Sequence, residues 1–134
     1  MFFSGDHAIA IARTNDLSAT DAYDATNPNF WSIDQNPIIP YTEHVENTSI
    51  DYEPSNGYYF LFTNYIKDSS YTDACWVYWT KDVENWDENN KAVVMDGTTS
   101  TWAHGAIGMP TVVKKDDKTL HWFMMENQEP IMYI

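Results

Sequence analysis

The sequence predicts an all-β fold made of antiparallel sheets. No long window repeats its apolar residues with the 3.6-residue period of an amphipathic helix. Short runs rich in Val, Ile, Tyr, Phe and Trp alternate instead with clusters of Gly, Pro, Asn and Asp, as in strands joined by turns. Aromatic residues make up 16% of the 134 residues, including six Trp and nine Tyr, and they suit a pleated, packed surface better than a helix.

The first four strands are expected as two pairs around short turns. Residues 2–4 (FFS) and 8–13 (AIAIAR) lie on either side of a Gly-Asp-His loop, which predicts a hairpin. Residues 48–52 and 58–64 flank a Pro-Ser-Asn-Gly turn in the same way. Glu53, beside this turn, is expected to be a surface carboxylate.

The later strands follow the same pattern of apolar runs and polar turns. The run at 74–80 (ACWVYWT) precedes a KDVENW turn and an outer strand at 92–95. Two further strands are expected at 110–114 and 119–125, and the apolar run at 131–134 is a candidate for a last one.

Two segments of the chain repeat one strand–turn–strand pattern. Residues 47–62 (NTSIDYEPSNGYYFLF) align with residues 109–124 (MPTVVKKDDKTLHWFM) without a gap, at a shift of 62 residues. The alignment places Ile50 on Val112, Tyr58 on Leu120, Phe60 on Trp122 and Leu61 on Phe123. A looser match elsewhere has a shift of 67 residues. Four-stranded antiparallel units repeated at a fixed period are typical of β-propeller blades.

The repeat predicts a single, partial propeller domain over residues 1–134. Residues 1–43 are expected to end one blade, residues 44–100 to form a complete blade, and residues 101–134 to begin the next. About two blades cannot close a ring, because each blade buries its faces only against its neighbours. The chain is then either a piece of a longer protein or a homo-oligomer subunit whose copies complete the propeller. A compact β-sandwich is the alternative fold.

The order of these segments resembles the five-bladed β-propeller glycosidases: glycoside hydrolase family 43, with its arabinanases and β-xylosidases, and the family 32 fructosidases. The segment ENTSIDYEPSNGYYFLF looks like the blade that opens with Glu-Gly-Pro in those families, with Glu46 on the Glu and Asn47 in place of the Gly. WTKDVENW (79–86) looks like the Ser-x-Asp-Leu-x-x-Trp word that leads into the outer strand. GMPTVVKKDDKTLHWFM looks like the next blade, with Pro110 on its proline. The resemblance therefore implies a partial five-bladed propeller.

The resemblance also implies a catalytic role for Glu46. In those families this Glu is the general acid, and two Asp residues from earlier blades complete the site. Cleavage of a glycosidic bond requires one protonated and one ionised carboxyl group. Asp6 and Asp34 do not lie in the required word, so neither is assigned a role, and Met109 stands where an Asp could stand. The structural alternative for Glu46 is a solvated carboxylate at a strand edge.

Four more residues are candidates for contact with a sugar: Asn47, Trp102, His104 and Trp31. Asn47 adjoins Glu46 in the same segment. Trp102 and His104 lie in TWAHGAIGMP, where glycines allow the backbone to approach a ligand closely. Trp31 lies in a loop and offers a flat apolar face. For the His and the two Trp, the alternative is structural packing.

Composition excludes several other classes of function. Twenty acidic against seven basic residues give a formal net charge of -13, which repels phosphate backbones, so no nucleic acid partner is expected. No apolar run is long enough to cross a membrane. Cys75 is the only cysteine; it lies in an apolar strand and is expected to be a buried thiol. No Cys/His zinc pattern occurs, and no stretch matches a D-x-D-x-D-G calcium loop, so no metal or other cofactor is predicted, although this acidity is compatible with a structural calcium.

Three functions compete at this point. The first is a glycoside hydrolase that cleaves a polysaccharide or oligosaccharide, with carbohydrate as its partner. The second is a propeller that binds carbohydrate without cleaving it, because Met109 cannot ionise. The third is a structural fragment whose parent protein carries the activity. The family resemblance implies a secreted or periplasmic protein, whereas the N-terminal segment lacks the basic region and the A-x-A site of a signal peptide.

Overall fold

The computed structural model describes residues 1–15, 31–67, 72–97, 99, 101–102, 107–116 and 119–125. These residues form an all-β structure, which confirms the predicted fold class. The strands are β1 (Phe2–Gly5), β2 (Ala8–Arg13), β3 (Ser32–Ile33), β4 (Val45–Glu53), β5 (Tyr58–Ile66), β6 (Thr72–Thr80), β7 (Lys91–Asp96), β8 (Gly108–Asp116) and β9 (Thr119–Met125). One short 3-10 helix, η1 (Tyr41–Glu43), precedes β4. The strand considered at 131–134 lies outside the described residues.

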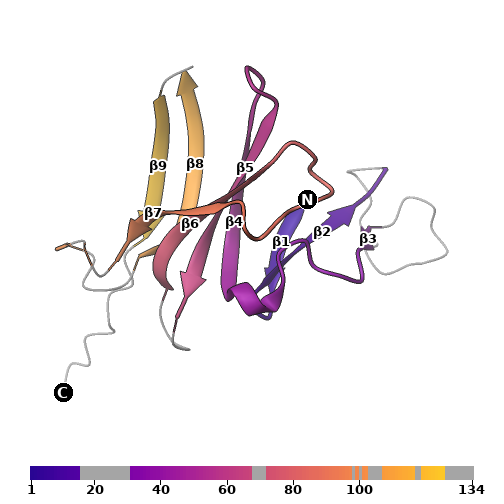
Figure 1. The fold of residues 1–134 in the computed structure, drawn as a ribbon, viewed down its shortest axis with the longest axis horizontal. Coiled ribbons are helices and arrows are strands. Elements are labelled where there is room, and N and C mark those ends of the chain that lie inside the picture. Colours follow the sequence, from indigo (N-terminus) through magenta and orange to yellow (C-terminus); the bar gives the residue numbers. More distant parts are fainter. Residues whose placement is uncertain are drawn as a thin grey trace.

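The strands form three antiparallel sheets (Figure 1). Their orders are β1-β2-β3, β4-β5-β6-β7 and β8-β9. The middle sheet is a four-stranded meander in chain order, as the predicted complete blade requires. Its first hairpin closes through the Pro-Ser-Asn-Gly turn, where Gly57 adopts a φ of 76° and donates its N–H to the Glu53 carbonyl at 2.8 Å. The assignment of the three sheets to blades of one propeller remains a prediction.

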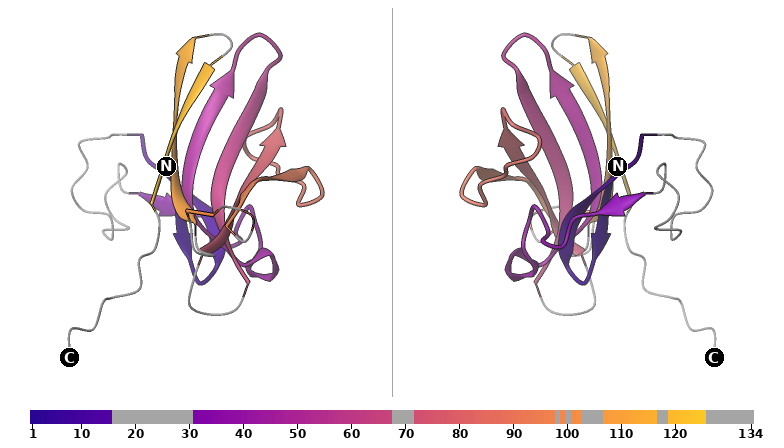
Figure 2. Two further views of the ribbon diagram at one scale, coloured as in Figure 1. Left: turned by 90° about the vertical axis from the view of Figure 1, so that its left-hand side faces the viewer. Right: turned by 90° about the vertical axis from the view of Figure 1, so that its right-hand side faces the viewer.

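The middle sheet is covered on both faces. One face packs against β1 and β2, where Ile9, Ile39, Val45, Leu61 and Tyr78 form the core cluster. The other face lies against β8, and Figure 2 shows the hairpin of β8 and β9 beside β4 and β5. Because successive side chains of a strand point to opposite faces, Leu61 and Phe62 pack against different neighbours, and both are buried.

The two hairpins that the sequence alignment matched carry a backbone irregularity at the same position. The β4–β5 register slips between Glu46 and Thr48, and the β8–β9 register slips between Gly108 and Thr111. Asn47 and Met109, which the shift of 62 residues superposes, have φ values of 49° and 53°. Such bulges bend a strand and redirect its side chains, so the repeat extends to backbone geometry.

The alignment is one residue out of register along part of β9. Ile50 pairs with Leu61, and its counterpart Val112 pairs with Trp122. The gapless alignment had instead matched Leu61 with Phe123. The difference arises at an additional register shift between Lys114 and Asp116 near the second turn, which sequence comparison alone does not reveal.

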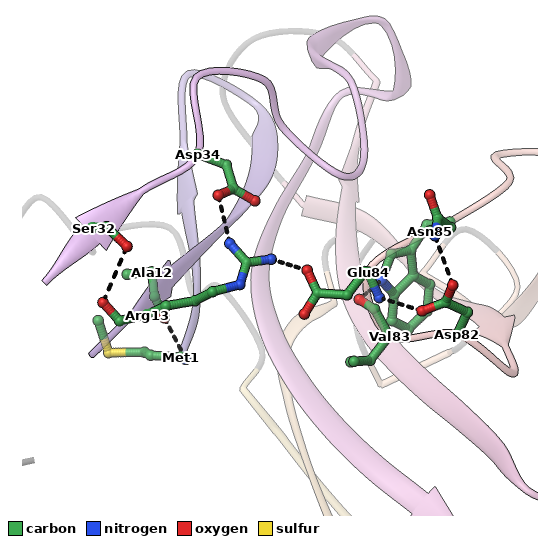
Figure 3. A network of polar contacts seen from close by, with 10 residues as sticks. Met1, Ala12, Arg13, Ser32, Asp34, Asp82, Val83, Glu84 and Asn85 are labelled. Carbon is green, nitrogen blue, oxygen red and sulfur yellow. Dashed lines mark hydrogen bonds and ion pairs between the residues drawn. The ribbon is translucent and has the colours of Figure 1, made fainter. Parts of the chain in front are cut away.

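Arg13 connects the first sheet to the middle sheet. Its guanidinium forms ion pairs with Asp34, just beyond β3, and with Glu84, in the turn between β6 and β7 (Figure 3). The Asp82 carboxylate holds this turn by accepting the Glu84 N–H at 3.1 Å, an Asx-turn arrangement. Asp34 is therefore engaged by Arg13, at the end of β2 away from the β1–β2 turn.

Glu53 lies at the surface, as expected, and it forms an ion pair with a residue of another sheet. Its side chain is 22% exposed, and the ammonium group of Lys114, on β8, donates to its Oε2 atom at 2.9 Å. This hydrogen bond, followed by those from Ser55, lowers the pKa of Glu53 from 4.5 to about 2. The ion pair connects the middle sheet to the β8–β9 hairpin.

We expect Lys114→Met to weaken the acid-side pH dependence of stability. A carboxyl group with a lowered pKa in the folded state stabilises fully above its unfolded pKa, and this contribution is lost as the pH falls from about 4.5 to about 2. In the variant the pKa of Glu53 should rise part of the way towards its ordinary value, because the Ser55 hydrogen bonds remain. Urea unfolding between pH 2 and 6 measures the effect, with Lys115→Met as the exposed control. An unchanged pH profile for Lys114→Met would show that the ion pair does not form.

Candidate functional site

Segments from all three sheets meet around the first residues of β4. The turn between β1 and β2 is fixed there because the Val45 N–H donates to the His7 carbonyl at 3.1 Å. The start of β8 is fixed there because the Met109 N–H donates to the Oδ1 atom of Asn64, on β5. Figure 1 shows the β1–β2 turn and the start of β4 at the same end of the molecule.

Glu46 lies at the centre of this region. Its Oε1 atom is 3.1 Å from Nδ1 of His7, and the two side chains are 35% and 39% exposed. Asn47, the next residue, is the bulged residue of β4. Because β4 is the edge strand of its sheet, a side chain at this bulge can reach both neighbouring sheets. Glu46 is therefore a partly enclosed carboxylate beside a histidine.

Two histidines near Glu46, His7 in space and His44 in the chain, have unusual backbone conformations. Asp6 and His7 have φ values of 50° and 61°, the positive values that a type I′ hairpin turn needs at both of its central residues. His44 ends η1 with a φ of 53°, and its N–H donates to the Tyr41 carbonyl at 3.1 Å. The rings of His7 and His44 lie with their centroids 5.9 Å apart.

Backbone strain in the described part of the chain is concentrated at this site. The non-glycine residues with positive φ there are Asp6, His7, His44, Asn47 and Met109. Such conformations cost about 1–3 kcal/mol each and persist where the surrounding structure enforces them, often at ligand-binding sites. All five residues belong to the segments that meet around Glu46, so the unusual backbone of the described residues is concentrated in this region.

Unpartnered polar atoms gather in the same place. Within the described ranges, the buried side-chain atoms that form no hydrogen bond are Nδ1 of His7, Oγ1 of Thr63 and Nδ2 of Asn64. The contact between His7 and Glu46 is thus a close approach of the two atoms without the angles of a hydrogen bond. Buried donors and acceptors are nearly always satisfied, so each exception requires an explanation. Asn64 pairs with Glu46 and shares its face of the sheet, whereas Thr63, the preceding residue of β5, points to the opposite face. The exceptions at His7 and Asn64 fit a site that completes its hydrogen bonds with a ligand.

Sequence analysis did not identify Asn64 as a site residue. It is fully buried, opposite Glu46 on β4 and Cys75 on β6. Its signal in the sequence is a polar Thr-Asn pair within the otherwise aromatic strand YYFLFTNYI. A buried polar residue is more informative than an exposed apolar one, but burial of this strand on both faces became evident only from the stacked sheets.

The other predicted residues are placed differently. Asn47 lies beside Glu46, as the sequence implied. Trp31 precedes β3, which pairs with the far end of β2 at Arg13, so the structure does not bring it to Glu46. Trp102 is 50% exposed, and its role as a sugar contact stays a prediction. His104 lies outside the described residues.

A buried polar cluster holds the segment that carries Glu46. The hydroxyl of Tyr78 donates to Oε2 of Glu43, in η1, at 2.7 Å, and the ammonium group of Lys91 contacts the same oxygen. Burial, together with the bond to Glu43, raises the pKa of Tyr78, so this hydroxyl stays protonated and acts as a donor. The cluster fixes η1 directly before His44.

Cys75 is a structural thiol. It is fully buried on β6, and burial raises its pKa to about 11. A nucleophilic cysteine needs the thiolate form, which this environment disfavours. The expectation of a buried thiol is therefore confirmed.

Comparison with known proteins finds no matching family model, curated protein or solved structure. In the portion of the chain that the structure describes, no helix is long and apolar enough to cross a membrane. The same portion contains no group of three or more His, Cys, Asp and Glu side chains arranged to hold a metal ion.

Proposed function

We propose that this chain is part of a carbohydrate-active β-propeller and that Glu46 is the general acid of a glycoside hydrolase reaction. The observation that carries the proposal is the convergence of backbone strain and unpartnered buried polar atoms around this one carboxylate. A general acid must be held at a fixed position while it gives its proton to the leaving oxygen. Enclosure between stacked sheets provides such a position.

The chemistry of the surrounding atoms favours a hydroxyl-rich ligand. His7 and Asn64 offer an imidazole nitrogen and an amide NH₂ group that form no hydrogen bond. Sugar hydroxyl groups donate and accept hydrogen bonds, so one sugar ring can satisfy several such atoms at once. This complementarity supports carbohydrate as the partner.

A carbohydrate-binding protein without hydrolytic activity is the second candidate. It is favoured by the start of β8, where the repeat places Gly108 at the position of Glu46, followed by Met109 with 46% exposure. Neither residue ionises, so the start of β8 supplies no carboxylate at the position equivalent to Glu46.

Incubation of the purified protein with a panel of oligosaccharides tests the proposal. We expect release of reducing sugar by the wild type and by Glu88→Gln, an exposed control in the turn before β7. Glu46→Gln should retain binding but lose turnover, because glutamine keeps the shape of the side chain without its proton. Binding without turnover in the wild type would support the second candidate. Failure of every glycan to bind would overturn the carbohydrate proposal.

A further inference from the structure

We propose that Asn64 is a positioning residue that anchors Glu46. Its amide oxygen fixes the start of β8, and its NH₂ group is the donor that receives the Glu46 carboxylate when this carboxylate leaves His7. This role deepens the proposed function, and it rests on that function only in treating Glu46 as the general acid.

The orientation of the Asn64 amide follows from its contact with β8. The Met109 N–H requires an acceptor, so the side-chain atom that faces it is Oδ1. The NH₂ group is therefore directed elsewhere, within a fully buried side chain, and forms no hydrogen bond. A buried amide donor without an acceptor is unfavourable, so a nearby acceptor should be drawn to it.

Glu46 is the strongest acceptor opposite Asn64. Residues that face each other across antiparallel strands have Cβ atoms about 4.5–5.5 Å apart, and Asn64 faces Glu46 on one side and Cys75 on the other. A thiol is a weak acceptor, whereas a carboxylate is a strong one. Bond rotations in the half-exposed Glu46 side chain would carry its carboxylate from His7 to Asn64.

The two donors approach Glu46 from different sheets. His7 belongs to the turn of the first sheet, and Asn64 belongs to the middle sheet and holds β8 through Met109. The Glu46 carboxylate therefore has two defined positions, one at His7 and one at Asn64, and does not rotate freely in solvent. Asn64 thus couples the position of the acid to the spacing between the middle sheet and the β8–β9 hairpin.

Nuclear magnetic resonance of the Asn64 side chain tests this inference without any substrate. In the wild type we expect a scalar coupling across the hydrogen bond between the Asn64 NH₂ nitrogen and the Glu46 carboxyl carbon. The coupling should become larger in His7→Gly, which removes the competing donor and suits the positive φ. It should disappear in Glu46→Ala, with a shift of the NH₂ signals, and stay unchanged in Glu88→Ala.

Identical Asn64 NH₂ signals in the wild type and in Glu46→Ala would overturn the proposal. His7→Gly and Glu46→Ala both alter partly exposed side chains, so the measurement does not depend on a substitution in the buried core. The result is also independent of glycan binding. A failed carbohydrate screen and a failed anchoring role can therefore be told apart.

Discussion

Leu61→Ala is expected to lower the free energy of unfolding by about 2–5 kcal/mol. Leu61 is fully buried at the centre of β5 and belongs to the cluster that joins the middle sheet to the first sheet. Ile9 and Ile39 contribute to this cluster from segments outside the middle sheet, and hydrogen-bonded backbone holds each of them. The sheets can therefore close only part of the cavity, and lost contacts add to lost burial.

Urea unfolding followed by tryptophan fluorescence measures this loss. Val93→Ala is the matched control, because Val93 is 57% exposed on β7 and its truncation should change stability by no more than about 0.5 kcal/mol. If Leu61→Ala cost no more than Val93→Ala, the sheets would not be packed as described.

Glu43→Ala is expected to destabilise the fold by about 1–3 kcal/mol, because it leaves the buried Tyr78 hydroxyl without an acceptor. The Glu43 side chain is 13% exposed, while Lys91 is 31% exposed. In the variant, water can therefore hydrate the Lys91 ammonium group, so the broken ion pair contributes little to the lost free energy of unfolding. Tyr78→Phe removes only the hydroxyl and should cost about 0.5–1.5 kcal/mol.

The double variant separates coupling from simple addition. If Glu43 and Tyr78 form one cluster, the combined loss should be smaller than the sum of the two single losses. Additive losses would contradict the cluster. Hydrogen exchange gives a local measure, because the Ile66 N–H donates to the His44 carbonyl at 2.9 Å. This amide should exchange faster in Glu43→Ala, since η1 no longer holds His44.

Local sequence patterns were sufficient to locate most strands. The runs at 8–13, 58–64 and 74–80 fall within β2, β5 and β6, because apolar alternation and turn residues act over a few neighbouring positions. The two-residue strand β3 and the 3-10 helix η1 were missed. Elements of two or three residues are too short to show a period, and β3 forms only because β2 offers it a partner.

Residues that matter at the candidate site were harder to predict. Glu46 and Asn47 are predicted because they stand in a segment that resembles a known blade. His7 was assigned only to a hairpin loop, and Asn64 was overlooked within an aromatic strand. The ion pair of Glu53 was not predicted, because the sequence does not show that Lys114 lies beside it.

The sequence by itself determined the all-β class, the hairpins and the position of the acidic residue before the aromatic strand. These features depend on side-chain alternation and turn chemistry between near neighbours. Only the tertiary structure decided that His7 and Asn64 lie beside Glu46 and that Asn64 binds the backbone of Met109. Their approach depends on strand register, on bulges that redirect side chains and on the stacking of separate sheets, and these are set by packing between segments far apart in the chain.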